Sequence, residues 1–249
     1  MTMRASTDAM RALAYVCAMA FDLGREHPDA ARRAYFQRRG DLLTPIVKGW
    51  CTETGQELAS IGVQIHGGMG FIEETGAAQL LRDARITTIY EGTTGIQAQD
   101  LVGRKTLRDG GAAVREVIAE ITTDLGRIPR AEDQRLAAIA HELETAVTAL
   151  TAALEWLLAN QAPDPRLVAA ASVHYLKLAG IVTGGWQLAR AATLCAEDLT
   201  TRQGDADFAN RMIASAHFFA TQVLPQAPGL ARIIAVGSAA VVSIPSSAL

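Results

Sequence analysis

The glutamate Glu91 stands in a stretch suited to catalysis or binding, IYEGTTGIQ at residues 89–97. Gly92 follows it, and Thr93 or Thr94 can cap a helix, so the carboxylate should lie where backbone N–H groups are unpaired. Two interpretations are open. The carboxylate can complement the helix dipole, or it can act as a general base, which needs burial to raise its pKa from about 4.3.

Three glycines, Gly67, Gly68 and Gly70, gather in VQIHGGMGFIEE at residues 63–74. Glycine permits positive φ and the close approach of another group, so the cluster predicts either a turn at a helix end or a seat for a ligand phosphate. It lacks the strand-borne GxGxxG pattern and the lysine of a P-loop. The cluster alone therefore leaves both interpretations open.

Other polar residues have plainer interpretations. His66 is expected to be structural, and Arg82 and Asp83 are expected to pair at a helix end and fix the loop that carries Glu91. No metal site is predicted, because the remaining histidines have no partners at metal-ligand spacing: His27, His141, His174 and His217.

Helical periodicity dominates the chain that must position these residues. Hydrophobic residues make up 49% and aromatic residues 5% of the sequence, which favours an all-α fold packed through small side chains. Apolar spacing from Leu43 to Ile61 predicts a long helix that ends before the glycines. A short helix is expected over residues 74–83, an extended ITTIY within 84–92, and a helix over 94–107.

The second half predicts an antiparallel helical bundle. A regular apolar stripe runs from Leu136 to Leu158, QAPDPR at residues 161–166 interrupts it, and an alanine-rich helix continues to about Leu199. A last helix spans Phe208 to Val223. Trp156 and Trp186 are expected in the core.

The chain divides near residues 127–132, into a first domain over 1–127 and a second bundle over 128–249. The net charge of −3 argues against a nucleic-acid partner. Three widely spaced cysteines indicate a reducing, cytoplasmic setting. No membrane span is expected, because the uncharged stretch after Arg232 is slightly short and contains Pro245, which favours a docked tail.

The two motifs together are more specific than either alone. QIHGGMGF followed by LLRDARITTIYEGT, in this order and spacing, resembles the C-terminal helical domain of the acyl-CoA dehydrogenase family. The similarity covers about Met3 to Arg108. The rest resembles the extra helical domain of longer bacterial members, a group that includes enzymes similar to 3-methylmercaptopropionyl-CoA dehydrogenase.

The resemblance implies a catalytic role for Glu91. In the family, the matching glutamate removes the α-proton of an acyl-CoA thioester while the β-hydrogen leaves as hydride to FAD. The backbone N–H of that glutamate, with a ribityl hydroxyl of FAD, binds the thioester carbonyl and stabilises its developing charge. Glu91 would thus contribute both its carboxylate and its N–H.

The resemblance also implies FAD-binding residues and partners. Gln64, Gly67 and Gly68 match the segment that lies against the ADP part of FAD, commonly a flavin held by a neighbouring subunit, and Thr93 matches a further contact. Gly95 departs from the glutamine of many shorter members, so one contact to the cofactor is in question. The implied partners are an acyl-CoA, electron-transfer flavoprotein or a similar acceptor, and further copies of the chain.

Family members place a helical domain and a β-domain before the region matched here, and the β-domain holds the flavin ring. The resemblance therefore implies the C-terminal portion of the enzyme, inactive until those domains are supplied, for example by a separate chain. Two alternatives remain open: a catalytically silent helical interaction or assembly module, and an acyl-CoA oxidase that passes electrons to oxygen. Neither the acyl group nor the electron acceptor follows from these residues.

Overall fold

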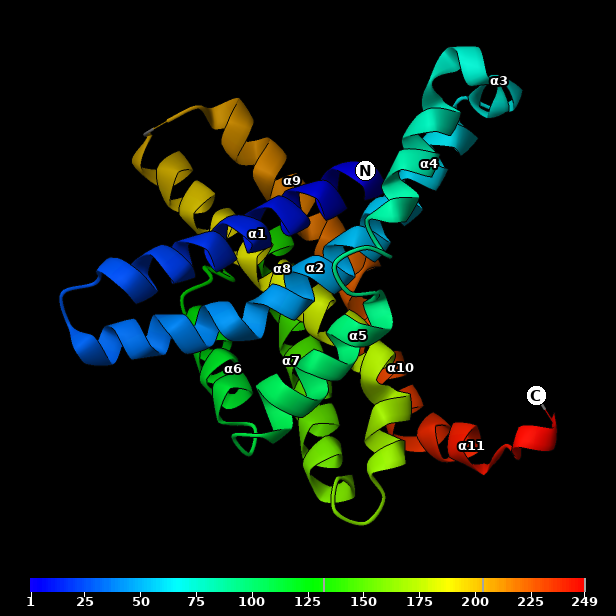
Figure 1. Ribbon diagram of the computed structural model, residues 1–249. Coiled ribbons are helices and arrows are strands. Elements are labelled where there is room, and N and C mark those ends of the chain that lie inside the picture. Colours follow the sequence, from blue (N-terminus) through cyan, green and yellow to red (C-terminus); the bar gives the residue numbers. More distant parts are fainter. Residues whose placement is uncertain (132, 203, 249) are drawn as a thin grey trace.

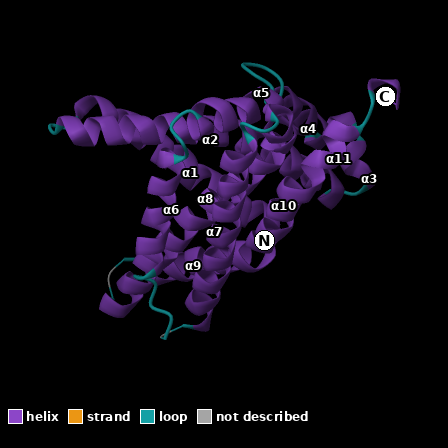
Figure 2. Cartoon of the chain, turned by 90° about the horizontal axis from the view of Figure 1, so that it is seen from below, coloured by secondary structure: helices purple, strands orange, loops and turns teal. Residues whose placement is uncertain are grey.

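The computed structural model describes residues 1–131, 133–202 and 204–248, and all regular structure in these ranges is helical (Figure 1, Figure 2). The prediction of an all-α chain is confirmed. The α-helices are α1 (Thr2–Glu26), α2 (Ala30–Ile65), α3 (Gly68–Phe71), α4 (Ala77–Ile86), α5 (Thr94–Gln99), α6 (Ala112–Leu125), α7 (Gln134–Asn160), α8 (Pro165–Thr201), α9 (Ala206–Gln222), α10 (Ala227–Arg232) and α11 (Ser238–Ser243). The π-helical stretches η2 (Asp100–Leu107) and η4 (Ile233–Gly237) continue α5 and α10.

Helices α1 and α2 form a long antiparallel hairpin (Figure 1). The Asp29 carboxylate starts α2 by accepting hydrogen bonds from the backbone N–H groups of Ala31 and Arg32, at 2.7 and 3.1 Å. Pro45 lies inside α2, where it cannot donate the usual helical hydrogen bond. The helix nevertheless continues to Ile65, which confirms the long helix predicted to end before the glycines.

Helix α8 is the centre of the second half, where it packs against α7 and α9. Asp164 caps its start, and Pro165 occupies the first turn, where its missing N–H costs nothing. Further along, α8 approaches α2 so closely that a Cβ on Gly180 would lie 2.2 Å from the side chain of Trp50. One hydrophobic core therefore runs through both halves, and the division near residues 127–132 stays a prediction.

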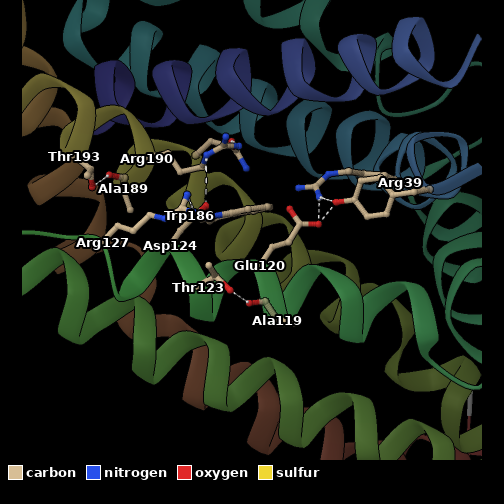
Figure 3. Close-up of polar contacts among 12 residues, drawn as sticks. Arg39, Ala119, Glu120, Thr123, Asp124, Arg127, Trp186, Ala189, Arg190 and Thr193 are labelled. Carbon is tan, nitrogen blue, oxygen red and sulfur yellow. Dashed lines mark hydrogen bonds and ion pairs between the residues drawn. The ribbon is translucent and has the colours of Figure 1, made fainter. Parts of the chain in front are cut away.

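Helix α6 connects the two halves through two carboxylates (Figure 3). Glu120 forms an ion pair with Arg39 of α2. Asp124 accepts a hydrogen bond from Trp186 Nε1 of α8 at 2.8 Å and lies 3.5 Å from Arg190 Nε. The buried Arg39 guanidinium also lies 4.9 Å from the centre of the Trp186 ring. These contacts fix α2 against α8, because breaking them would leave a buried charge unpaired.

Residues 60–86, the end of α2 with α3 and α4, project from the bundle as an arm (Figure 1). Helix α4 packs back along α2, and a single 3₁₀ turn at Glu73–Thr75 separates it from α3. The arm exposes large apolar side chains: Ile65, Met69, Phe71, Ile72, Leu80 and Ile86. A concentration of exposed apolar surface of this kind marks a surface for interaction.

The C-terminal tail docks on α7 and α8, as expected for this uncharged stretch. Leu230, Ile234 and Ser238 are buried there, whereas Val236 and Val241 are exposed. By length and hydropathy alone, both α8 and the stretch Ala206–Ser243 could span a membrane; 67% of the apolar window in α8 is buried, against 22% in the later stretch. Of the two expected core tryptophans, Trp186 is buried and Trp156 is half-buried.

The expectation of an extended ITTIY stretch was wrong. Ile86 ends α4, and residues 87–91 form a turn in which Ile89 and Tyr90 donate their backbone N–H groups to the Ile86 carbonyl at 3.0 and 3.1 Å. In the part of the chain that the structure describes, these β-branched residues have no strand to pair with, so local turn hydrogen bonds prevail over their strand propensity. The short helix expected over residues 74–83 forms as α4, shifted to Ala77–Ile86.

Candidate functional site

The glycine segment joins α2 to α3, and different physical constraints explain why glycine occupies each of its positions. Gly67 has φ 59° and ψ −145°, a conformation that residues with side chains rarely adopt. Gly70 packs on α2, where a Cβ would lie 2.2 Å from the Val63 carbonyl oxygen. Gly68 has neither constraint, since apart from its chain neighbours and its own helix backbone no described atom lies within 4 Å of its Cβ position. Turn and packing thus explain Gly67 and Gly70, whereas the backbone at Gly68 is open to a group from outside the chain.

Gln64 and His66 flank this segment at the end of α2. Gln64 is exposed, so its side-chain amide is accessible beside Gly68. His66 Nδ1 lies 2.8 Å from the Gly62 carbonyl oxygen, a local contact that agrees with the structural role expected of this histidine. The Gln64 amide and the bare backbone are therefore accessible at the tip of the arm, which also exposes His66, Glu73 and Glu74.

Glu91 lies in a strained turn between α4 and α5. Its φ is 53°, and among the described non-glycine residues only Arg202 shares a positive value. This left-handed conformation costs about 1–2 kcal/mol and persists where the surrounding structure holds it, often at functional sites. The backbone N–H groups of residues 91–93 donate to no described residue. One turn therefore presents both a carboxylate and free N–H donors.

The predicted Arg82–Asp83 pair does not hold this turn, and that expectation was wrong. Arg82 instead forms a two-pronged ion pair with Glu73, at 2.9 and 2.5 Å, and braces the arm. The physical reason is that adjacent residues on a helix point in different directions and do not face each other. Both Arg82 and Asp83 are exposed.

The contacts that do hold the turn come from its two sides. Before Glu91, Lys48 Nζ of α2 donates to the Thr87 carbonyl oxygen at 2.6 Å. After it, Gln97 Nε2 donates to the Glu91 carbonyl oxygen at 3.3 Å. Thr93 caps α5 by accepting a hydrogen bond at 3.4 Å from a backbone N–H of the first turn. Thr93 therefore has a structural task, in addition to any contact with a ligand.

A hollow of about 430 Å³ lies beside Glu91 between α1, α2 and the turn. Burial raises the pKa of the Cys51 thiol to about 12 and also raises the pKa of Cys17, so both thiols are neutral at pH 7 and form weakly polar walls. Glu91 itself is exposed, so the burial expected of a general base would come from a group that covers the hollow. The hollow is lined by Cys17, Thr44, Val47, Lys48, Cys51, Thr52, Thr87, Tyr90 and Glu91.

The predicted site residues form two groups rather than one. Gln64, Gly67 and Gly68 lie at the tip of the arm, whereas Glu91 and Thr93 lie at its base, beyond the other end of α4. A ten-residue helix is about 15 Å long, so one small ligand would not touch both groups within a single chain. In the described part of the chain, no cluster of three or more metal-ligating side chains occurs.

An all-helical chain that presents a carboxylate with free N–H groups, and a bare glycine segment on an arm, has the features of the C-terminal region of an acyl-CoA dehydrogenase. Residues 1–106 match the family described as "Acyl-CoA dehydrogenase, C-terminal domain". Residues 112–245 match the family described as "Acetyl-CoA dehydrogenase C-terminal like". The chain belongs to the acyl-CoA dehydrogenase family, as its motifs predict.

The chain is 50% identical over 224 residues to 3-methylmercaptopropionyl-CoA dehydrogenase of Ruegeria pomeroyi, covering 89% of this chain and 37% of that protein. It is 29% identical to a butyryl-CoA dehydrogenase of Syntrophomonas wolfei, covering 97% of this chain and 40% of that protein. The fold is similar to that of Caenorhabditis elegans ACDH-11, solved in complex with C11-CoA, with a TM-score of 0.72, 21% identity, and coverage of 89% of this chain and 35% of that one. The chain therefore spans well under half the length of these relatives.

Proposed function

We propose that this chain is the C-terminal portion of an FAD-dependent acyl-CoA dehydrogenase, with Glu91 as the base that removes the α-proton of an acyl-CoA thioester. The observation that carries the proposal is the turn at Glu91. It holds a carboxylate in a strained conformation at the edge of a hollow, beside N–H groups that donate to no described residue. A carboxylate that only complements a helix dipole does not need such a conformation.

The same turn can serve both parts of the reaction. A thioester carbonyl bound by the Glu91 N–H would gain negative charge as the α-proton leaves, and a fixed N–H donor stabilises that charge most when water is excluded. The Glu91 carboxylate would take the proton. Neutral thiols and Val47 in the hollow would exclude water once a substrate covers it, so that the carboxylate would act in a site of low polarity.

The arm fits the role of an FAD-binding element. The open backbone at Gly68 leaves room for a pyrophosphate or ribose, and the exposed Gln64 amide can donate to one. FAD would supply the acceptor for the β-hydride. Because Gln64, Gly67 and Gly68 lie far from Glu91 along the arm, they suit the flavin of a neighbouring subunit, whereas Thr93 suits the flavin beside Glu91.

The full activity requires more than this chain. The relatives are more than twice as long, and their remaining length would hold the flavin ring and much of the acyl-CoA site. Such domains from the same or a separate chain, further copies of this chain, and an electron acceptor such as electron-transfer flavoprotein are the proposed partners. Turnover by the chain alone is expected to be negligible.

The second candidate function is a helical assembly module without catalysis, and the exposed apolar residues of the arm favour it. An acyl-CoA oxidase would share the chemistry of Glu91 and differ only in passing electrons to oxygen. If an acyl-CoA bleaches the flavin absorbance under nitrogen and the absorbance recovers rapidly in air, the enzyme is an oxidase.

The test is a visible spectrum of the chain alone and of the chain purified with any product of the adjacent upstream reading frame, each supplied with FAD. Retained flavin absorbance that bleaches on addition of an acyl-CoA supports the proposal. A mixture that stays colourless would contradict a catalytic role for this polypeptide and leave the assembly module.

A further inference from the structure

Lys48 is a half-buried cation that lies in the same hollow as Glu91. Its ammonium donates to the Thr87 carbonyl oxygen at 2.6 Å and lies 5.3 Å from the centre of the Tyr90 ring. Both partners belong to the turn that ends at Glu91. Lys48 therefore reaches from α2 across to the turn and holds two of the four residues that precede the glutamate.

No carboxylate of the described residues forms an ion pair with Lys48. A half-buried ammonium normally gains a carboxylate partner, because desolvation disfavours an unpaired charge. Here a carbonyl and an aromatic face substitute for one. Among the residues that line the hollow, Lys48 is the only lysine or arginine and Glu91 the only carboxylate.

Further anchors of the turn lie after Glu91. The Thr94 hydroxyl hydrogen-bonds to the Glu53 carboxylate, and Gln97 Nε2 donates to the Glu91 carbonyl oxygen. Before Glu91, the Ala84 carbonyl oxygen of α4 accepts hydrogen bonds from Thr87, and the Thr94 N–H donates to the Thr88 carbonyl oxygen at 3.3 Å. Lys48 adds the contacts to Thr87 and Tyr90 that come from α2. Lys48 is thus the side chain that ties the half of the turn before Glu91 to α2.

We infer that Lys48 is a positioning residue that holds the Thr87–Glu91 turn closed, so that the Glu91 carboxylate and N–H stay beside the hollow. The inference deepens the proposed function and rests on it for its catalytic consequence, whereas the mechanical part concerns this chain alone. A hydrogen bond from a charged donor is stronger than one from a neutral group, so its loss should open the turn measurably.

Hydrogen–deuterium exchange of the Ile89 and Tyr90 amides tests the mechanical part, since both donate to the Ile86 carbonyl within the turn. Lys48→Met keeps an unbranched side chain, one atom shorter, but removes the ammonium, and should speed exchange at these amides by about tenfold. Lys48→Arg should restore much of the protection. Lys177→Met on the exposed surface of α8 is the matched control and should leave the turn unchanged.

Unchanged exchange in Lys48→Met, or faster exchange spread evenly over all helices, would overturn the inference. In the assembled enzyme, Lys48→Met should slow flavin bleaching at saturating acyl-CoA by about tenfold or more while the affinity for acyl-CoA stays the same, and Lys48→Arg should recover most of the rate. A variant that bleaches at the full rate would also overturn it. If no enzyme bleaches at all, the proposed function fails, but the exchange result still decides whether Lys48 holds the turn.

Discussion

The strained conformation of Glu91 predicts that glycine at this position stabilises the fold relative to alanine. A residue with a Cβ at φ 53° pays about 1–2 kcal/mol, which glycine avoids. The greater conformational entropy of glycine stabilises the unfolded chain by about 0.5–1 kcal/mol, which offsets part of that advantage. Glu91→Gly should therefore unfold with a free energy about 0.5–1 kcal/mol higher than that of Glu91→Ala.

Glu142 in the middle of α7 is the matched control, because its backbone is helical. There, Glu142→Gly should be about 1 kcal/mol less stable than Glu142→Ala. Glycine should thus be more stable than alanine at position 91 and less stable than alanine at position 142. Urea unfolding followed by far-ultraviolet circular dichroism measures all four free energies of unfolding. Equal dependence of the free energy on urea concentration in the four variants is the check of two-state behaviour. If alanine is the more stable residue at position 91 as well, the turn is not strained as described.

Two further predictions concern the glycine segment and the thiols. Gly70→Ala should lower the free energy of unfolding by about 1–3 kcal/mol, because its Cβ would clash with the Val63 carbonyl. Gly68→Ala should leave stability unchanged and weaken FAD retention. If the two variants are equally stable in thermal unfolding, the prediction is wrong. Burial raises the pKa of the Cys51 thiol from 9.0 to about 12. The stability that the neutral thiol contributes is therefore fully present below pH 9 and is lost as the pH rises toward 12. Cys51→Ala should flatten that fall in unfolding measured against pH, and an unaltered slope would contradict the assignment.

The long helices were predictable because each buries a continuous apolar stripe. The spacing from Leu136 to Leu158 places one face of α7 in the core. Pro165 lies in the first turn of α8, and the glycine segment follows the end of α2. The same argument failed for ITTIY at residues 86–90. Propensity favours a strand there, but the described residues contain no partner strand to supply its hydrogen bonds.

The site was predictable only as far as its motifs reached. Order and spacing in the sequence predict Glu91 and Gly68 as site residues, but the positive φ of Glu91 has no sequence signature, because glutamate rarely adopts it. Lys48 carries no motif either. It lies 43 positions before Glu91, and only the folding of α4 back along α2 brings the turn within its reach.

The proposed removal of the acyl-CoA α-proton by Glu91 can be tested by hydrogen exchange at that carbon. The flavin-loaded assembly, incubated with an acyl-CoA in deuterium oxide, should exchange the α-hydrogens, as followed by mass spectrometry. Glu91→Gln should keep its flavin and lose this exchange by a factor of at least about 10², the usual contribution of a general base, whereas Glu142→Gln should exchange normally. Undiminished exchange in Glu91→Gln would contradict this role and place the base on another residue.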